Sequence, residues 1–202
     1  MVPSGNKKFA QMEDVKKYQG WSILVDCDGV LTNGQKIVDA TGKRQMIAFH
    51  SRDSIASKAL VEMGFQIIVL TNSNFGGIRN YWDKYGATII WAQGKDYLQS
   101  KWKALSHYKD DLSIDWEKTI GIGDDVTDIC YLEKCKKAYC PLDAHSILLN
   151  CVIPAIARGQ RRLPKDFKPV NIDKLKVNGG DGILSELLFQ IQIGKAIYHA
   201  EH

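Results

Sequence analysis

The sequence predicts an α/β protein built on a doubly wound, Rossmann-like parallel sheet. Short apolar runs alternate with longer amphipathic segments along most of the chain. The runs are rich in Ile, Val or Leu, which is typical of strands buried on both faces. Repeated strand–helix–strand units favour right-handed crossovers, with helices on both faces of the sheet. A chain of 202 residues suits one domain, expected over 21–202 after an N-terminal extension over 1–20.

Five apolar runs are predicted to be strands, over residues 22–25, 66–70, 88–91, 119–122 and 137–140. Helices are expected between them. Ser51 or Asp53 is predicted to cap a helix that ends at Met63, just before Gly64. Further helices are predicted over 75–85, 96–108, 126–134, 144–150 and 182–198.

Two segments break this alternation. Residues 36–49 place Thr41-Gly42 between two apolar stretches, which predicts a β-hairpin inserted after the first strand and suited to act as a flap. Residues 156–176 are basic, contain two prolines and show no periodicity. We interpret this second segment as a surface excursion and leave its role open.

The charge and hydropathy of the chain narrow the classes of partner. Basic residues are dispersed and the formal net charge is only +4, so nucleic-acid binding has little support, whereas a small anionic substrate is compatible. The first twenty residues are polar, and no apolar run is long enough to span a bilayer. A cytoplasmic protein without a membrane partner is expected.

Two carboxylates follow the first predicted strand in Asp26-Cys27-Asp28-Gly29. The carboxyl ends of parallel strands form the usual ligand site of such sheets. With Mg²⁺ present, one carboxylate can attack phosphorus while the other transfers a proton to and from oxygen. Taken alone, the same residues are also typical of an ordinary turn.

Three more carboxylates, Asp124, Asp125 and Asp128, follow the run over 119–122. One of them can bind a hard cation while the others support it, although acidic residues at a helix start are equally typical of capping. Carboxylates that converge from two strand ends repel one another unless a cation or a proton relieves them. Together the two motifs favour a metal site.

A phosphate group also needs donors and positive charge. Thr71 and the backbone N–H of Asn72 follow the second predicted strand and face the same edge of the sheet, although a plain helix cap explains them as well. Lys95, Lys101 and Lys103 are the candidate cations, and any one of them is more often a solvated surface charge.

In this order, the motifs resemble those of the haloacid dehalogenase (HAD) superfamily of phosphotransferases. Within it, the chain looks most like the 3-deoxy-D-manno-octulosonate 8-phosphate (KDO 8-phosphate) phosphatase family over residues 21–188. The resemblance implies a hydrolase that forms an aspartyl-phosphate with Asp26 as nucleophile and magnesium ligand. Asp28 is then the general acid and base and binds the metal through its backbone carbonyl, and Asp124 is the third protein ligand.

The resemblance also implies roles around these groups. Asp125 and Asp128 would support the ligands, while Thr71 and the Asn72 N–H would hold the phosphoryl oxygens. Lys101 would neutralise the transferring group, and it is favoured over the other two lysines because residues 101–105 resemble the Lys-led helix start of the family.

The spacing of the motifs leaves no room for a cap domain. The hairpin, helices and strands fill the intervals from Asp26 to Thr71 and from Thr71 to Asp124. A site without a cap needs a neighbouring subunit to exclude water. The family resemblance implies the same, as a homotetramer in which hairpins associate and adjacent protomers close each site.

Departures from the family pattern keep the substrate open. Ser73 stands where the family tends to have Arg, Ser54 where it tends to have Gly, and Asp181 where Arg is common. Arg52 can bind a substrate carboxylate bidentately, or it is simply an exposed residue at a helix start. Both KDO 8-phosphate and nine-carbon N-acylneuraminate or deaminated neuraminate (KDN) 9-phosphates fit.

Two other function classes share parts of this pattern. A response-regulator receiver also combines an acidic pocket, a Thr and a Lys, but it lacks the second Asp of the Asp26–Asp28 pair. A catalytically silent oligomerising domain of HAD type would not need the complete acidic set. Both classes are therefore weaker interpretations than a phosphatase.

Overall fold

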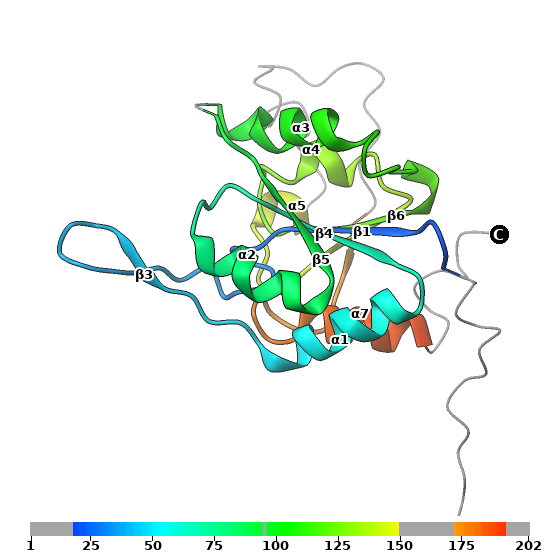
Figure 1. Ribbon diagram of the computed structural model, residues 1–202, viewed down its shortest axis with the longest axis horizontal. Coiled ribbons are helices and arrows are strands. Elements are labelled where there is room, and N and C mark those ends of the chain that lie inside the picture. The colour runs from blue at the N-terminus through cyan, green and yellow to red at the C-terminus, as the bar shows by residue number, and fades with distance from the viewer. Residues whose placement is uncertain (1–17, 95, 150–171, 193–202) are drawn as a thin grey trace, which may run out of the picture.

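The computed structural model describes residues 18–94, 96–149 and 172–192. Its main sheet has six strands in the order β5-β4-β1-β6-β7-β8, and every neighbouring pair is parallel (Figure 1). The predicted doubly wound α/β fold is confirmed. The strands are β1 (Ser22–Val25), β4 (Gln66–Thr71), β5 (Ala87–Trp91), β6 (Thr119–Ile122), β7 (Lys137–Cys140) and β8 (Ile172–Lys174).

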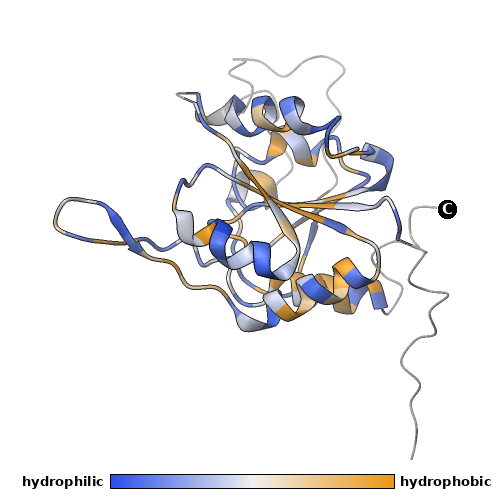
Figure 2. Ribbon diagram, viewed as in Figure 1, coloured by the Kyte–Doolittle hydropathy of each residue, from blue (hydrophilic) through white to orange (hydrophobic). Residues whose placement is uncertain are grey.

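Alternation along the strands divides the core into two layers. Ile23 and Val25 of β1 pack into one buried cluster, and Leu24 between them packs into the other. Successive strand side chains point to opposite faces, so a strand covered on both faces is apolar throughout. Figure 2 shows that hydrophobic residues are concentrated in the strands of the sheet.

Helices cover both faces of the sheet. One cluster contains side chains of α1 (Ser51–Glu62), α2 (Gly76–Trp82) and α7 (Ile183–Gln192), and α1 and α7 lie side by side. The other contains side chains of α3 (Tyr97–Tyr108) and α4 (Ile129–Leu132), together with Leu148 of α5. Short 3₁₀ turns, η2 and η3, complete the described helices; α5 is Ser146–Leu149, η2 is Asp83–Tyr85 and η3 is Trp116–Lys118.

The predicted N-cap residues of α1 are wrong, whereas the helix ends before Gly64 as predicted, with Met63 as its C-cap. His50 is the N-cap residue, and its Nδ1 accepts a hydrogen bond of 3.2 Å from Arg52 N. Asp53 instead caps α7, because its Oδ1 accepts hydrogen bonds from Leu184 N at 2.7 Å and Ser185 N at 3.2 Å. Local spacing cannot reveal a cap that reaches a helix more than a hundred residues away.

Part of the segment predicted as a surface excursion is a strand. β8 falls inside the range 156–176 and pairs with β7, where Ala138 lies opposite Ile172. A three-residue edge strand carries too little periodicity to be recognised in a basic stretch. The rest of that prediction up to residue 171, the end of the predicted helix beyond residue 192 and residues 1–17 of the extension lie outside the described residues.

The predicted hairpin is formed by β2 (Ile37–Val38) and β3 (Arg44–Met46), and it projects from the body of the protein (Figure 1). Asp39 closes its turn by accepting hydrogen bonds from Thr41 N and Lys43 N. Ile37 and Met46 are 57% and 60% exposed on it. No described helix combines the length and the hydropathy that a membrane crossing requires.

Candidate active site

Three carboxylates meet where β1 and β6 end. Asp26 directly follows β1, and Asp124 and Asp128 follow β6. One oxygen of each lies within 4.8 Å of the others. The two strands are neighbours in register, with Val25 opposite Ile122, and Asp26 N donates to Ile122 O at 3.0 Å. The register of the sheet thus brings both sequence motifs to one place.

Gly29 permits the close approach of these two motifs. Its φ is +94°, in the region that favours glycine, and an added Cβ would overlap the carboxylate of Asp124. The glycine of the first acidic motif is therefore required by the second, which packs against it.

Lys101 supplies a buried positive charge to this cluster. It lies on α3 with only 2% exposure, and its Nζ is 2.8 Å from Asp26 Oδ1 and 2.6 Å from Asp128 Oδ1. Burial alone would lower the pKa of Lys101, but the two carboxylates outweigh it and raise that pKa above its ordinary value. The structure leaves Lys103 exposed, and Lys95 lies outside the described residues.

Burial, together with an excess of negative over positive groups, raises the carboxyl pKa values of the cluster. Burial is the largest cause and raises the pKa of Asp26 to about 7, with Lys101 opposing and Asp128 adding to the rise. Burial, then the charges of Asp128 and Asp26, raise the pKa of Asp124 to about 9. Such groups ionise readily only if another cation joins them.

One carboxylate oxygen is suited to bind such a cation. Asp124 Oδ1 is buried, and no described residue donates a hydrogen bond to it. A buried acceptor without a partner is costly, whereas Mg²⁺ binds such hard oxygen atoms. Asp26 and Asp124 therefore have the chemistry and the proximity to hold a divalent metal.

Asp128 organises the loop that carries Asp124. Its Oδ2 accepts hydrogen bonds of 3.1 Å from the backbone N–H groups of Asp124 and Asp125, and its Oδ1 meets Lys101. Asp125 is half-buried and accepts a bond from Val126 N. Both residues therefore accept hydrogen bonds from the backbone of the loop that begins at Asp124.

Thr71 is the last residue of β4, and Asn72 follows it directly. Thr71 is buried, and its Oγ1 accepts a 3.0 Å hydrogen bond from Ser73 N, so the hydroxyl hydrogen can be donated to an anion. Asn72 Oδ1 accepts a 3.0 Å bond from Ser100 Oγ, next to Lys101 on α3. The two residues therefore reach the same strand edge as the acidic cluster.

Arg44 is a site residue that the sequence analysis missed. It comes from β3 of the hairpin, and its Nη2 and Nη1 donate to Asp28 Oδ1 and Oδ2 at 2.8 and 3.1 Å. Nη1 also lies 3.3 Å from the Oγ of Ser73, the position where the family pattern has an arginine. No local spacing signals this contact, because the residues belong to different elements.

Arg52 lies away from the acidic cluster. It is exposed at the start of α1 and lines a hollow of about 280 Å³ together with Asp181, Glu186 and Phe189. None of the carboxylates near Asp26 lines this hollow. The structure therefore does not bring Arg52 into contact with the predicted catalytic groups.

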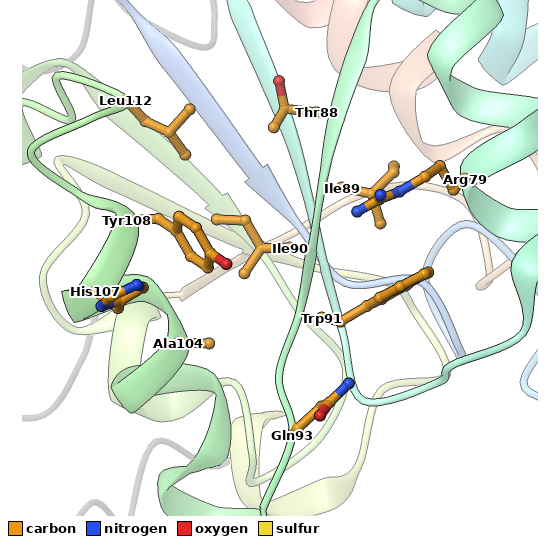
Figure 3. Close-up of a pocket in the computed structure, with 10 residues that line it drawn as sticks. All are labelled: Arg79, Thr88, Ile89, Ile90, Trp91, Gln93, Ala104, His107, Tyr108 and Leu112. Atoms are coloured by element: carbon orange, nitrogen blue, oxygen red, sulfur yellow. The ribbon is translucent and has the colours of Figure 1, made fainter.

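A larger hollow of about 480 Å³ lies along β5, one of the two edge strands of the sheet (Figure 3). Arg79 and Trp91 line one side of the strand, and Ile90, His107 and Tyr108 line the other. None of the predicted site residues lines it. The larger of these two hollows therefore does not coincide with the proposed active site.

The chain is similar to a curated enzyme and to several solved structures. No family model matches the chain. The curated 3-deoxy-D-manno-octulosonate 8-phosphate phosphatase KdsC of Haemophilus influenzae is 29% identical over 130 residues, which are 64% of this chain and 69% of the relative.

Solved structures share the fold of the chain. The cobalt-bound form of the Haemophilus influenzae phosphatase has a TM-score of 0.68 at 23% identity, covering 89% of this chain and 91% of that one. The enzyme of Moraxella catarrhalis, solved with magnesium, phosphate and KDO, has a TM-score of 0.65 at 20% identity, covering 93% and 95%. The sheet and its helices are therefore those of these structures.

Proposed function

We infer the function from one premise: this chain is related to the KDO 8-phosphate phosphatases of the HAD superfamily. On that premise it is a magnesium-dependent phosphatase that hydrolyses the phosphomonoester of a small sugar acid. The observation that carries the proposal is the meeting of Asp26, Asp124 and Asp128 within 4.8 Å, with Lys101 bound to the first and last. Neither a receiver domain nor a catalytically silent domain requires these four residues together with Asp28.

Asp26 is the proposed nucleophile. Its carboxylate oxygen bonds to phosphorus while the bond from phosphorus to the sugar oxygen breaks, and Asp28 gives a proton to that oxygen. Water then attacks phosphorus of the aspartyl-phosphate, and Asp28 takes the proton of the water. The products are the sugar acid, inorganic phosphate and the free Asp26 carboxylate.

Asp26, Asp124 and the backbone carbonyl of Asp28 are the proposed protein ligands of Mg²⁺. A bound magnesium ion stabilises negative charge on the transferring group and keeps the two carboxyl groups ionised. Asp128 holds the loop of Asp124 through its two backbone hydrogen bonds, so that the ligand is already oriented. Asp125 is proposed to support the same turn.

Lys101, Thr71 and Asn72 are proposed to receive the phosphoryl oxygens. Lys101 is held at Asp26, so its charge lies beside the attacking oxygen. The Thr71 hydroxyl and the Asn72 N–H are donors at the end of the neighbouring strand. Fixed donors at the place where charge develops stabilise phosphoryl transfer.

KDO 8-phosphate is the first proposed substrate, because the Haemophilus influenzae relative is a phosphatase of that compound. Nine-carbon N-acylneuraminate and KDN 9-phosphates remain the alternative, since Ser73 and Asp181 depart from the family pattern. Arg52 keeps its proposed role toward a substrate carboxylate only if the sugar reaches the hollow near Asp181. Assays of both substrate sizes decide between them.

We also propose that the chain is a single cytoplasmic domain over 21–202 that assembles as a homotetramer. The hairpin supports assembly, because Ile37 and Met46 leave apolar surface on a projecting element. A neighbouring subunit would then close the site, for which the motif spacing predicts no cap domain. Light scattering of the purified protein measures the assembly directly.

The test of the proposed function is a phosphate-release screen of phosphorylated sugar acids with and without Mg²⁺. We expect turnover of an eight- or nine-carbon sugar acid phosphate that disappears with a chelator and returns with Mg²⁺. Phosphatase activity that is unchanged by the chelator, or no release of phosphate from any phosphomonoester, would refute the proposal.

A further inference from the structure

Arg44 holds the carboxylate that is proposed to act as general acid and base. Both oxygens of Asp28 accept hydrogen bonds from the Arg44 guanidinium, at 2.8 and 3.1 Å. The guanidinium is well enclosed: its side chain is 10% exposed, it contacts Ser73 Oγ at 3.3 Å, and it lies 5.8 Å from the centre of the Phe75 ring. Arg44 and Asp28 thus form a largely enclosed, bidentate salt bridge.

This contact is incompatible with turnover. Asp28 must face the oxygen of the leaving sugar, but Arg44 occupies both of its carboxylate oxygens. The guanidinium therefore has to release Asp28 when the substrate is bound. Arg44 lies on a hairpin that projects from the body, and its Nε donates a hydrogen bond of 3.3 Å to Met46 O on the same hairpin. Release requires only that the Arg44 side chain leave Asp28.

The position of Arg44 indicates what it binds after release. Asp28 faces the leaving group, so a residue on Asp28 lies on the sugar side of the site. The described ion-pair partners of Lys101 are Asp26 and Asp128, which places that cation on the phosphoryl side. A planar carboxylate can accept two hydrogen bonds from one guanidinium, as the Asp28 carboxylate does in this structure. A carboxylate of the substrate could therefore take the place of Asp28.

We propose that Arg44 is a specificity residue that exchanges Asp28 for the carboxylate of the substrate. In this exchange Arg44 binds the sugar acid and releases Asp28 at the same time. A sugar phosphate without a carboxylate cannot displace Asp28, which then stays bound to Arg44. The proposal rests on the phosphatase function and names the group on the substrate that this chain selects.

The test compares two substrates in matched variants. Arg44→Gln should lower kcat/KM for KDO 8-phosphate by about 10- to 100-fold, mainly through KM, because one charge-assisted two-pronged contact is lost. For glucose 6-phosphate, which has no carboxylate, the same variant should lose no kcat/KM, because without Arg44 the Asp28 carboxylate is already free. Arg44→Lys should recover part of the affinity, and Lys43→Gln, a charge loss at an exposed position of the same hairpin, should not alter the substrate ratio.

A binding measurement separates this inference from the proposed function. Calorimetry should show that free KDO binds the protein about 10-fold more weakly after Arg44→Gln, while its methyl ester binds both forms alike. Equal losses for both substrates, or equal KDO binding by both forms, would overturn the role of Arg44 even if the protein is a phosphatase. A binding difference in a protein without phosphatase activity would support Arg44 and refute the function.

Discussion

Lys101 Nζ lies 2.8 Å from Asp26 Oδ1, and both side chains are buried. The pair joins α3 to the end of β1, so a charge on a helix meets the proposed nucleophile at the carboxyl edge of the sheet. Asp128, whose Oδ1 lies 2.6 Å from the same ammonium, makes the contact a triad of two carboxylates and one cation. The proposed chemistry and the stability of this edge of the sheet therefore involve the same three residues.

Replacing Lys101 should destabilise the protein strongly. Lys101→Met leaves Asp26 and Asp128 buried without their counter-charge, and breaking a buried pair in this way costs about 3–5 kcal/mol. Urea unfolding measures the change. Adding Asp128→Asn to that variant should recover part of the loss, and a Lys101→Met protein as stable as the wild type would contradict the triad.

Magnesium should stabilise the protein more at pH 8 than at pH 6. The pKa values of Asp26 and Asp124 are raised to about 7 and about 9, so without metal their contribution to stability is full below about pH 4 and is lost as pH rises through those values. A cation favours the ionised groups and reverses this loss. The shift in Tm on adding Mg²⁺ measures the effect.

Asp124→Asn is the matched variant for the magnesium prediction. It keeps the size of the side chain but removes the charge of a proposed ligand, so the Mg²⁺ shift in Tm should shrink at both pH values. The same shift in both proteins would show that the ion binds elsewhere.

Asp53 should couple the stability of α7 to pH. Burial raises its pKa to about 6, and the backbone N–H groups of Ser185 and Leu184 oppose that rise. Because the folded pKa lies above its ordinary value, the contribution of Asp53 is full below about pH 4 and is lost as pH rises through about 6. Asp53→Asn should flatten this part of the pH profile of urea unfolding.

Asp53→Ala is the companion change. It removes the acceptor of Leu184 N and Ser185 N and should cost about 1–3 kcal/mol, more than Asp53→Asn, which keeps an acceptor oxygen. Equal losses in the two variants would mean that the cap contributes little.

Gly29→Ala should weaken the site more than the fold. The new Cβ would overlap Asp124, and the positive φ adds strain of about 1–3 kcal/mol. We expect a smaller Mg²⁺ shift in Tm and lower phosphatase activity. Gly42→Ala has a similar φ of +79° but open space around its Cβ, so it should carry only the strain and leave the magnesium response unchanged.

The sheet and the acidic cluster could be predicted because they depend on local patterns. β1 and β6 are buried along their whole length and carry Ile, Leu or Val at several positions, and a parallel sheet brings their carboxyl ends to one edge. Asp26 and Asp124 therefore lie close together because each follows one of two neighbouring parallel strands. The hairpin was predictable for the same reason, from Thr41-Gly42 between apolar stretches.

The rest depends on contacts between distant elements. Arg44 reaches Asp28 from the hairpin, and Asp53 of α1 caps α7, and neither contact leaves a trace in local spacing. Ser73 showed only that an expected arginine was absent, and the structure places Arg44 beside it. β8 was missed because three residues on a sheet edge carry little pattern.

The central claim is that Asp26 attacks phosphorus. Wild-type protein and an Asp28→Asn variant would be mixed with ³²P-labelled KDO 8-phosphate and Mg²⁺, then quenched in acid and digested for mass spectrometry. We predict an acid-stable phosphoryl group on the peptide that holds Asp26, more abundant in Asp28→Asn because breakdown is slowed, and absent from an Asp26→Asn variant. Full turnover with label only in inorganic phosphate, or the same turnover in Asp26→Asn, would contradict the account.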